Sequence, residues 1–393
     1  MSAPSRKFFL VACEASGDLH ASELIRELKK NQPSLEFRGL GGPKMAAAGM
    51  SLIEDMTRIS ALGFGDVLRQ YFKYRRIFYA ALEEIKKDKP DVLILIDSPA
   101  FNLRLAKKAR SLFADLNIFY YICPQIWAWG HRRIHNVRKN ITKMYSILPF
   151  EASFYAQWGV DCEYVGNPLI DEASKSSDDR LPLRKKMGIP EEIQAIGLLP
   201  GSRQSEVGRI LPVMLCTALE IQKELPKTEF FLAPSPNIPA MVYEKILSKF
   251  SVKIQKFETP FYEAVKAMDF ALVTSGTATL QTALANTPFC LLYKTSWSTY
   301  LLGKQLIRVP CLGIVNLLAG KTVAPEFIQW DANPKTIAQT AKNFLLNPEL
   351  CENMRCEFGK IRAQLGEQGA SQRAAQSMMA FLNRRNAPME IPV

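Results

Sequence analysis

A short turn of small polar residues, Ser275-Gly276-Thr277, has the composition of a phosphate-binding site. It follows the apolar run 270–273 and precedes an Ala- and Leu-rich stretch, which predicts a strand, a turn and a helix in succession. Backbone N–H groups and the positive end of the helix dipole then point at one place, and glycine lets an anion approach the backbone. The turn therefore predicts a phosphate site, with an unliganded helix cap as the alternative.

A second turn of this kind contains an arginine. The apolar run 195–199 is followed by Gly201, Ser202 and Arg203, and a helix is expected next. A guanidinium can hold a diphosphate through two parallel hydrogen bonds and neutralise the charge of a departing nucleotide. A solvated surface arginine is the alternative. The position at the end of a strand, in the same half of the chain as Gly276, favours the binding role.

Ionisable residues follow the first apolar run of the chain, residues 8–12. Glu14, Ser16, Gly17 and Asp18 occupy the turn that comes next. Gly17 permits close approach of a ligand, and both carboxylates are expected to face the ligand crevice. A polar cap on the following helix is the alternative interpretation.

Asp97 comes directly after the continuous apolar run 92–96. Such runs are typical of strands buried in parallel sheets, so the carboxylate is expected at the carboxyl end of a strand. In that position it is a candidate general base for a hydroxyl nucleophile. Capping of the next helix, or orientation of a neighbouring loop, explains the same residue equally well.

Residues 60–79 mix aromatic and basic side chains. A helix with this composition suits an anionic membrane surface or an acyl chain. A core-facing stripe with a solvated basic face is the alternative, but the aromatic residues are too many for one narrow stripe. The residues expected to contact the membrane are Leu68, Arg69, Phe72, Arg75 and Arg76.

Two series of strands and helices must position these residues. The first has predicted strands at 7–12, 92–96 and 118–122 and helices at 20–30, 68–88 and 102–114; the second has strands near 195–199, 229–233, 252–256, 270–274 and 289–293. This alternation predicts an α/β protein with two Rossmann-like domains and a deep ligand cleft between them.

The predicted domains cover 1–170, on the acceptor and membrane side, and 171–346, which would bind the nucleotide. A final helical region, within 347–393, is expected to pack back on the first domain or to pair with a second copy of the chain in a homodimer.

The composition of the chain restricts the kinds of ligand and partner that it is expected to bind. The 393 residues carry a formal net charge of +12, which favours anionic ligands. Nucleic acid is not expected, because the basic residues are dispersed and no recognition motif occurs. Eight cysteines without a CxxC pair favour a reducing, cytoplasmic location. With only three histidines, none spaced with cysteines as ligands, no metal or other cofactor is predicted. No apolar run is long enough to span a membrane.

Ordered motifs along most of the chain are similar to those of the lipid-A-disaccharide synthase family, glycosyltransferases with the two-domain GT-B fold. The motifs are Glu14 to Asp18, Gly41 to Met45, Pro124 to Trp129, Leu148 to Glu151, Val165 to Leu169, Leu199 to Arg203, Ser275 to Leu280, Val315-Asn316 and Pro325-Glu326.

The resemblance implies an inverting, metal-independent glycosyl transfer at the inner membrane of a Gram-negative bacterium. UDP-2,3-diacylglucosamine would donate its sugar to the 6-hydroxyl of 2,3-diacylglucosamine 1-phosphate, giving a β-1,6-linked disaccharide 1-phosphate and UDP. It implies that Arg203 and the Ser275 turn hold the diphosphate. Asn316 and Glu326 are assigned to substrate binding on the same ground. The first domain would present the acceptor.

Three positions depart from the family pattern. Ala100 stands where a carboxylate is usual, which leaves Asp97 as the candidate base, with Glu14 as the second candidate catalytic residue. Gln281 stands where a glutamate is usual, in a position suited to ribose hydroxyls. Asn167 replaces a frequent histidine. Other GT-B enzymes, such as epimerases or transferases with different lipid acceptors, and a non-catalytic membrane- or nucleic-acid-binding protein are the alternatives.

Overall fold

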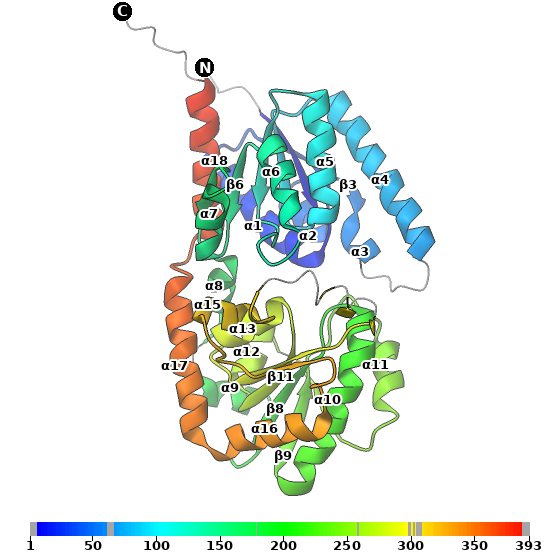
Figure 1. Ribbon diagram of the computed structural model, residues 1–393, viewed down its shortest axis with the longest axis vertical. Coiled ribbons are helices and arrows are strands. Elements are labelled where there is room, and N and C mark those ends of the chain that lie inside the picture. Colours follow the sequence, from blue (N-terminus) through cyan, green and yellow to red (C-terminus); the bar gives the residue numbers. More distant parts are fainter. Residues whose placement is uncertain are drawn as a thin grey trace, which may run out of the picture. The chain divides into compact units, whose positions relative to one another are not determined.

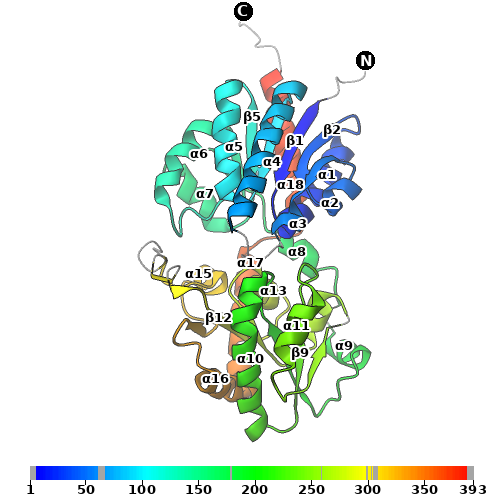
Figure 2. The same ribbon diagram turned by 90° about the vertical axis from the view of Figure 1, so that its right-hand side faces the viewer.

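The computed structural model describes residues 6–60, 67–177, 179–257, 259–297, 300–301, 303 and 309–386, except the side chains of residues 59–60, 67–71 and 386. The chain divides into two compact units. The first consists of residues 1–168 together with 365–393, and the second of residues 169–364. Figures 1 and 2 show the elements of each unit.

A seven-stranded parallel sheet forms the centre of the first unit. Its strands are β1 (Lys7–Ala12), β2 (Glu36–Gly41), β3 (Ser51–Asp55), β4 (Val92–Ile96), β5 (Asn117–Tyr121), β6 (Lys143–Ser146) and β7 (Cys162–Tyr164), in the order β3-β2-β1-β4-β5-β6-β7. Its helices are α1 (Ala15–Asn31), α2 (Pro43–Ala47), α3 (Met56–Ser60), α4 (Val67–Asp88), α5 (Pro99–Leu112), α6 (Ile134–Asn140), α7 (Pro149–Ala156) and α18 (Ala370–Asn386), with a 3-10 turn at His131–Arg133.

Helices cover both faces of this sheet, which is why its central strands are continuously apolar. Alternate residues of β4 point to opposite sides: Leu93 packs with α4, α5 and α6, whereas Ile94 packs with α1 and α18. Helices α1 and α18 lie side by side in both views although most of the chain separates them in sequence (Figures 1 and 2). Burial of Met378 and its neighbours therefore makes the last helix part of the first unit's core.

A six-stranded parallel sheet forms the centre of the second unit. Its strands are β8 (Gln194–Leu199), β9 (Thr228–Leu232), β10 (Ile254–Lys256), β11 (Phe270–Thr274), β12 (Phe289–Tyr293) and β13 (Glu326–Ile328), in the order β10-β9-β8-β11-β12-β13. Its helices are α8 (Pro168–Ala173), α9 (Arg180–Lys186), α10 (Gln204–Glu224), α11 (Ala240–Leu247), α12 (Phe261–Lys266), α13 (Thr277–Leu284), α15 (Ile314–Ala319), α16 (Pro334–Leu346) and α17 (Pro348–Gln364).

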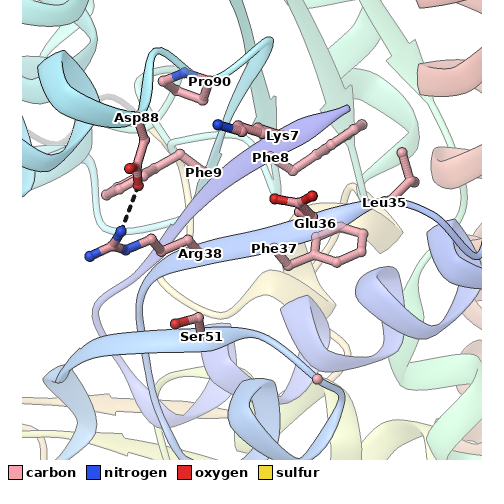
Figure 3. A pocket seen from close by; sticks show the side chains of 11 residues that line it. Lys7, Phe8, Phe9, Leu35, Glu36, Phe37, Arg38, Ser51, Asp88 and Pro90 are labelled. Atoms are coloured by element: carbon pink, nitrogen blue, oxygen red, sulfur yellow. Dashed lines mark hydrogen bonds and ion pairs between the residues drawn. The ribbon is translucent and has the colours of Figure 1, made fainter. Parts of the chain in front are cut away.

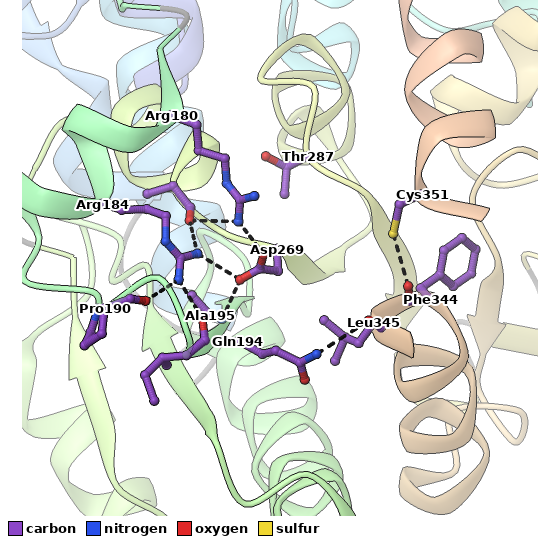
Figure 4. A network of polar contacts seen from close by, with 12 residues as sticks. Arg180, Arg184, Pro190, Gln194, Ala195, Asp269, Thr287, Phe344, Leu345 and Cys351 are labelled. Carbon is purple, nitrogen blue, oxygen red and sulfur yellow. Dashed lines mark hydrogen bonds and ion pairs between the residues drawn. The ribbon is translucent and has the colours of Figure 1, made fainter. Parts of the chain in front are cut away.

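An ionic network around the buried Arg184 fastens α9 to this second sheet (Figure 4). Asp269, just before β11, accepts hydrogen bonds from Arg180 at 2.5 Å, from Arg184 at 2.9 Å and from the backbone N–H of Ala195 in β8 at 2.8 Å. Arg184 is almost fully buried and also donates to the carbonyl oxygen of Pro190. The network therefore ties the segment that enters the second unit to two adjacent strands.

The prediction of an α/β protein with two Rossmann-like sheets is confirmed. Five strands were not predicted because they are short or carry few apolar residues, namely β2, β3, β6, β7 and β13. The carboxy-terminal helical region is interrupted after α17, where Gly366 and Gly369 have φ angles of 76° and 94°. No helix in the described part of the chain has the length and apolar character needed to cross a membrane.

Candidate functional site

The first unit has its topological switch point between β1 and β4. These strands are hydrogen-bonded neighbours, and the connections that leave them run to opposite sides of the sheet. In open α/β sheets, ligands bind at the carboxyl ends of the two strands that flank such a point. The predicted residues Glu14 and Asp97 follow these two strands directly, so the topology brings the two candidate catalytic carboxylates to one edge.

The turn after β4 has an unusual backbone. Asp97 and Ser98 have φ angles of 49° and 46°, a left-handed conformation that is uncommon for residues other than glycine. The carbonyl oxygen of Asp97 accepts hydrogen bonds from the Asn102 amide at 2.7 Å and from the Tyr120 hydroxyl. These two buried side chains hold the turn in place, and strain of this kind concentrates at functional sites.

Cys13 joins the two turns. Its thiol, just after β1, is buried and forms a hydrogen bond with Ser98, and the charges of Glu14 and Asp97 both act on it. Burial raises the pKa of Cys13 to about 12, so the thiol is neutral at physiological pH. Glu14 and Asp97 are the two carboxylic side chains of this cluster.

The other predicted residues of the first turn have different surroundings. Asp18 is buried and accepts backbone hydrogen bonds from Gly42, Lys44 and Met45 at 2.9, 3.1 and 3.0 Å, so it caps α2. Gly17 packs closely on the sheet, since a Cβ there would stand 3.3 Å from that of Ala12. Ser16 is exposed in the first turn of α1. Asp18 and Gly17 thus shape this edge, and their contact with a ligand stays a prediction.

A cavity of about 980 Å³ opens beside these turns, within the first unit. Cys13, Glu14, Ser98 and Ala100 line one end of it. Its aromatic lining residues are Tyr74, Phe78, Tyr79, Phe101 and Trp129. Its cationic lining residues are Arg75, Arg104, Lys107, Lys108 and Arg133. The volume lies at the upper end of the range for small-molecule sites, about 300–1,000 Å³.

The residues predicted to meet a membrane lie on α4, at the side of this cavity. Phe72 is 58% exposed, and Arg75 and Arg76 are exposed. The side chains of Leu68 and Arg69 fall outside the described residues. Membrane contact therefore stays a prediction for all five.

Sequence reasoning did not select Glu151, which is buried in α7. Its carboxylate accepts hydrogen bonds from the Trp127 indole at 3.0 Å and from the backbone of Leu148 at 3.2 Å. Burial raises the pKa of Glu151 to about 7, and the charge of Asp97 acts in the same direction. Glu151 holds the segment after β5 that supplies Trp129 to the cavity. The available signal was that Trp127 and Glu151 each belong to one of the family-like motifs, Pro124 to Trp129 and Leu148 to Glu151.

The second unit has an equivalent switch point between β8 and β11, again hydrogen-bonded neighbours. Gly201, with φ 105°, follows β8, and a Cβ there would lie 3.4 Å from Cγ2 of Thr274 at the end of β11. The Arg203 turn and the Gly276 turn are therefore adjacent, at the amino ends of α10 and α13. Both predicted phosphate-binding turns meet at one place.

This place is open to an anion. Gly276 has φ 150°, and no heavy atom would contact a Cβ there within 4 Å. Ser202, Gly276 and Thr277 are exposed, and Ser275 is half-buried. The backbone N–H of Ser275 is bonded to Leu292 and that of Thr279 to the carbonyl of Gly276. The N–H groups of residues 276–278, at the start of α13, have no acceptor one turn earlier in the helix and can therefore bind a ligand.

Arg203 is more than half exposed, at the entrance to α10. Its guanidinium contacts Glu206 at 3.0 Å, and Glu206 also accepts a hydrogen bond from the Arg203 backbone. The ion pair holds the arginine beside the Gly201 turn. An exposed pair of this kind contributes little to stability, so an anionic ligand can compete for the guanidinium at small cost.

Three further predicted residues of the second unit are engaged inside the protein. Asn316 is buried and bonds to Glu326, to the carbonyl of Ala324 and to two backbone N–H groups. Glu326 also accepts from the backbone of Leu312 and Gly313. Gln281 forms a hydrogen bond with Tyr262. Asn316 and Glu326 thus fix the segment around α15, and direct ligand contact by all three stays a prediction.

A second cavity, of about 460 Å³, lies at the amino ends of β1, β2 and β3 (Figure 3). Its most prominent cation, Arg38, is paired with Asp88 at 2.9 Å and with Glu84. The catalytic edge of a parallel sheet is the carboxyl edge, which is the opposite one. We therefore assign no substrate to this cavity.

Comparison with known proteins identifies the family. Residues 8–381 match the family model described as Lipid-A-disaccharide synthetase. A lipid-A-disaccharide synthase 1 of Legionella pneumophila (strain Lens) is 38% identical over 378 residues, which cover 96% of this chain and 98% of the relative. A lipid-A-disaccharide synthase of Myxococcus xanthus is 37% identical over 385 residues, covering 97% and 99%.

Solved structures share the fold at low identity. A UDP-GlcNAc 2-epimerase from Neisseria meningitidis has a TM-score of 0.62 and 12% identity, covering 95% of this chain and 99% of its own. The calicheamicin glycosyltransferase CalG4 has a TM-score of 0.61 and 13% identity, covering 98% and 100%. With two Rossmann-like units, two switch-point sites and relatives matched over nearly their full length, the chain belongs to the lipid-A-disaccharide synthase family of glycosyltransferases.

Proposed function

We propose that the chain transfers 2,3-diacylglucosamine from its UDP donor to the 6-hydroxyl of 2,3-diacylglucosamine 1-phosphate. The products are a β-1,6-linked disaccharide 1-phosphate and UDP. The observation that carries this proposal is the meeting of two open, anion-binding turns, at Arg203 and Gly276, in a chain of this family.

The second unit holds the donor. The diphosphate lies against the Gly276 turn, where the backbone N–H groups at the start of α13 and the dipole of this helix stabilise negative charge. Arg203 leaves Glu206 and binds the diphosphate bidentately. Because charge develops on the UDP leaving group during transfer, these contacts strengthen in the transition state and accelerate the reaction.

The first unit presents the acceptor. Asp97 accepts the proton of the 6-hydroxyl as that oxygen attacks the anomeric carbon from the face opposite UDP, which inverts the configuration. The strained turn fixes the direction of this carboxylate, with Asn102 and Tyr120 as positioning residues. Glu14, on the neighbouring turn, contacts the acceptor sugar.

The membrane meets the protein at α4. Phe72 supplies an exposed apolar contact, and Arg75 and Arg76 supply charge for anionic lipids. The protein thereby reaches both lipid substrates. The triple variant Phe72→Ser/Arg75→Gln/Arg76→Gln should co-sediment less with anionic liposomes than the wild type. The control variant Lys86→Gln/Lys87→Gln, at the far end of α4, should co-sediment as the wild type does. Equal co-sedimentation of all proteins would remove this role.

The activity is tested with purified protein, both proposed substrates and detergent, following UDP and disaccharide by mass spectrometry. Acceptor-dependent formation of both products in equal amounts is the expected result. Release of UDP without a disaccharide would overturn the proposal in favour of donor hydrolysis or another acceptor. Reactions that lack either substrate, and reactions with the Asp97→Asn protein, are the controls and should form no or much less disaccharide.

A further inference from the structure

The side chains that line the cavity beside the first switch point carry an excess of positive charge. Five cationic side chains line it, against the single carboxylate of Glu14. Within the described part of the chain, none of these five cations has a carboxylate within 4.0 Å, unlike several other cations of the same unit, such as Lys86, which is paired with Glu83. The cavity is therefore ready to receive an anion.

Helix α5 arranges three of these charges in sequence. Ala100 and Phe101 lie in its first turn, next to the Asp97 turn, and Arg104, Lys107 and Lys108 follow on the same face at spacings of three and four residues. At 1.5 Å per residue, Arg104 stands about 6 Å along the axis from Ala100. An anion bound there lies near the first turn of α5, which follows the Asp97 turn directly.

A cation from another segment completes this end of the cavity. The Arg133 guanidinium stacks over the ring of Trp129, 4.3 Å from its centroid, and both residues line the cavity. Stacking restricts the guanidinium while its N–H donors stay available for a phosphate. Trp129 is placed by the segment that Glu151 anchors through Trp127.

The remaining wall is apolar. Phe78 of α4 and Phe101 of α5 pack edge to face, with ring centroids 5.5 Å apart, and Tyr74 and Tyr79 extend this wall along α4. An acyl chain laid on such a wall buries its CH₂ groups away from water, which favours binding. One cavity thus offers cations for a phosphate and aromatic rings for a hydrocarbon chain.

We propose that this cavity is the acceptor subsite: its cations bind the 1-phosphate of the acceptor, and its aromatic wall holds one of the acyl chains. The inference rests on the proposed function, which it deepens by naming the site of the acceptor. The 1-phosphate and the hydroxymethyl group that carries the 6-hydroxyl flank the ring oxygen of glucosamine. The phosphate therefore reaches the cations of α5 when the hydroxyl is at Asp97.

The phosphate part is tested by equilibrium binding without a donor. Wild-type protein in detergent is titrated with 2,3-diacylglucosamine 1-phosphate and with its dephosphorylated form, following intrinsic tryptophan fluorescence. The wild type should prefer the phosphorylated lipid. Lys107→Ala/Lys108→Ala should reduce this preference about tenfold. Lys86→Ala/Lys87→Ala is the matched control, because it removes an identical lysine pair from the neighbouring helix and should keep the wild-type preference.

Kinetics separates this inference from the proposed function. The lysine variant should raise the KM for the acceptor, with kcat and the KM for the donor close to wild type. Unchanged preference in the variant, or an equal loss in both double variants, would overturn the subsite. A variant that loses only its binding to anionic vesicles would assign the lysines to the membrane instead. Selective lipid binding without turnover would overturn the reaction and leave the subsite standing.

The acyl-chain part is tested with Phe101→Ala and acceptors of long and short acyl chains. The variant should lose affinity for the long-chain acceptor at least about fivefold more than for the short-chain one. A loss that is equal for both lipids would indicate a general packing defect and would overturn the acyl contact. Thermal unfolding of the variant shows whether it remains folded.

Discussion

The carboxylate of Asp18 lies so close to Gly42 that a Cβ on the glycine would stand 2.6 Å from one carboxylate oxygen. The same carboxylate accepts the backbone N–H of Gly42 at 2.9 Å. Asp18 of α1 thus caps α2, and its side chain fits there only because residue 42 is a glycine. Two residues of separate motifs are thereby coupled by packing.

Gly42→Ala should destabilise the protein by about 1–3 kcal/mol, the usual cost of overpacking a tight contact. Chemical denaturation measures this change. Gly208→Ala is the control, because Gly208 lies in the second turn of α10 and a Cβ there meets no atom within 4 Å; this variant should stabilise the protein by about 0.5–1 kcal/mol. Equal stability of the two variants would contradict the proposed coupling.

Asp97→Asn should lower kcat by about 10²–10⁴-fold, the range for loss of a general base. Asparagine tolerates the left-handed backbone of this turn, so stability should change little. Initial rates at saturating substrates give kcat. Asp115→Asn, in an exposed loop, should behave as the wild type. An Asp97→Asn protein that is folded and fully active would exclude Asp97 as the base.

Arg203→Ala should weaken binding of UDP by about 2–3 kcal/mol, as expected for a charge-assisted contact. Titration calorimetry with UDP measures the loss. Arg209→Ala, further along the exposed side of α10, is the matched control. The same affinity in the Arg203 and Arg209 variants would remove Arg203 from the diphosphate site.

Asp269→Ala should destabilise the second unit by about 3–5 kcal/mol, because Arg184 is then left buried without its partner. The pKa of Asp269 is held below its usual value: burial acts to raise it, and Arg180 with the hydrogen bonds of Ala195 and Arg184 outweighs this. Glu263→Gln breaks an exposed pair with Lys186 and should cost no more than about 1 kcal/mol. Similar losses for both variants, measured by denaturation, would contradict the network's importance.

Glu151→Gln should gain stability relative to the wild type as pH rises. Burial raises the pKa of Glu151 from 4.5 to about 7, so the folded protein binds a proton that the unfolded chain has already lost between these values. The native carboxyl therefore costs stability as pH increases through this window, and glutamine does not. The difference should reach about 3 kcal/mol above pH 7, measured by urea unfolding at several pH values.

His20→Asn provides a control of opposite sign. Burial lowers the pKa of His20 from 6.5 to about 4, with a smaller contribution from Lys44. The unfolded chain therefore binds the extra proton, and wild-type stability is lost as pH falls from about 6.5 to 4. As pH falls through this range, the His20→Asn variant should become more stable relative to the wild type. Parallel pH curves for both variants would contradict these assignments.

Much of the architecture follows from continuous apolar runs. The residues of β4 are all apolar and buried, and the strand lies where it was predicted. The unpredicted β7 has only three half-buried residues, Cys162 to Tyr164, and exists because it pairs with β6. Such a strand is specified by its neighbour and has no signal of its own.

Of the candidate site, the turns that require glycine could be predicted from the sequence. Gly201 and Gly276 have φ angles that favour glycine, and both were selected as turns at the ends of strands. Side-chain roles were harder to predict. Asp18 and Asn316 accept hydrogen bonds from backbone groups of other segments, and in sequence a polar side chain of this kind looks the same as a ligand-binding one. The burial that raises the pKa of Glu151 also cannot be read from the sequence.

The packing of α18 against α1 has a consequence for biosynthesis. A ribosome releases the first 168 residues long before the helix that covers Ala21 and Ile25, and the whole second unit emerges in between. At about 5–20 residues per second, this interval lasts on the order of ten seconds or more. During that time the nascent chain exposes the apolar surface that α18 later covers, such as the ring of Phe119, which packs against Phe381. This makes the chain a candidate client for chaperones, while the uninterrupted second unit is free to fold first.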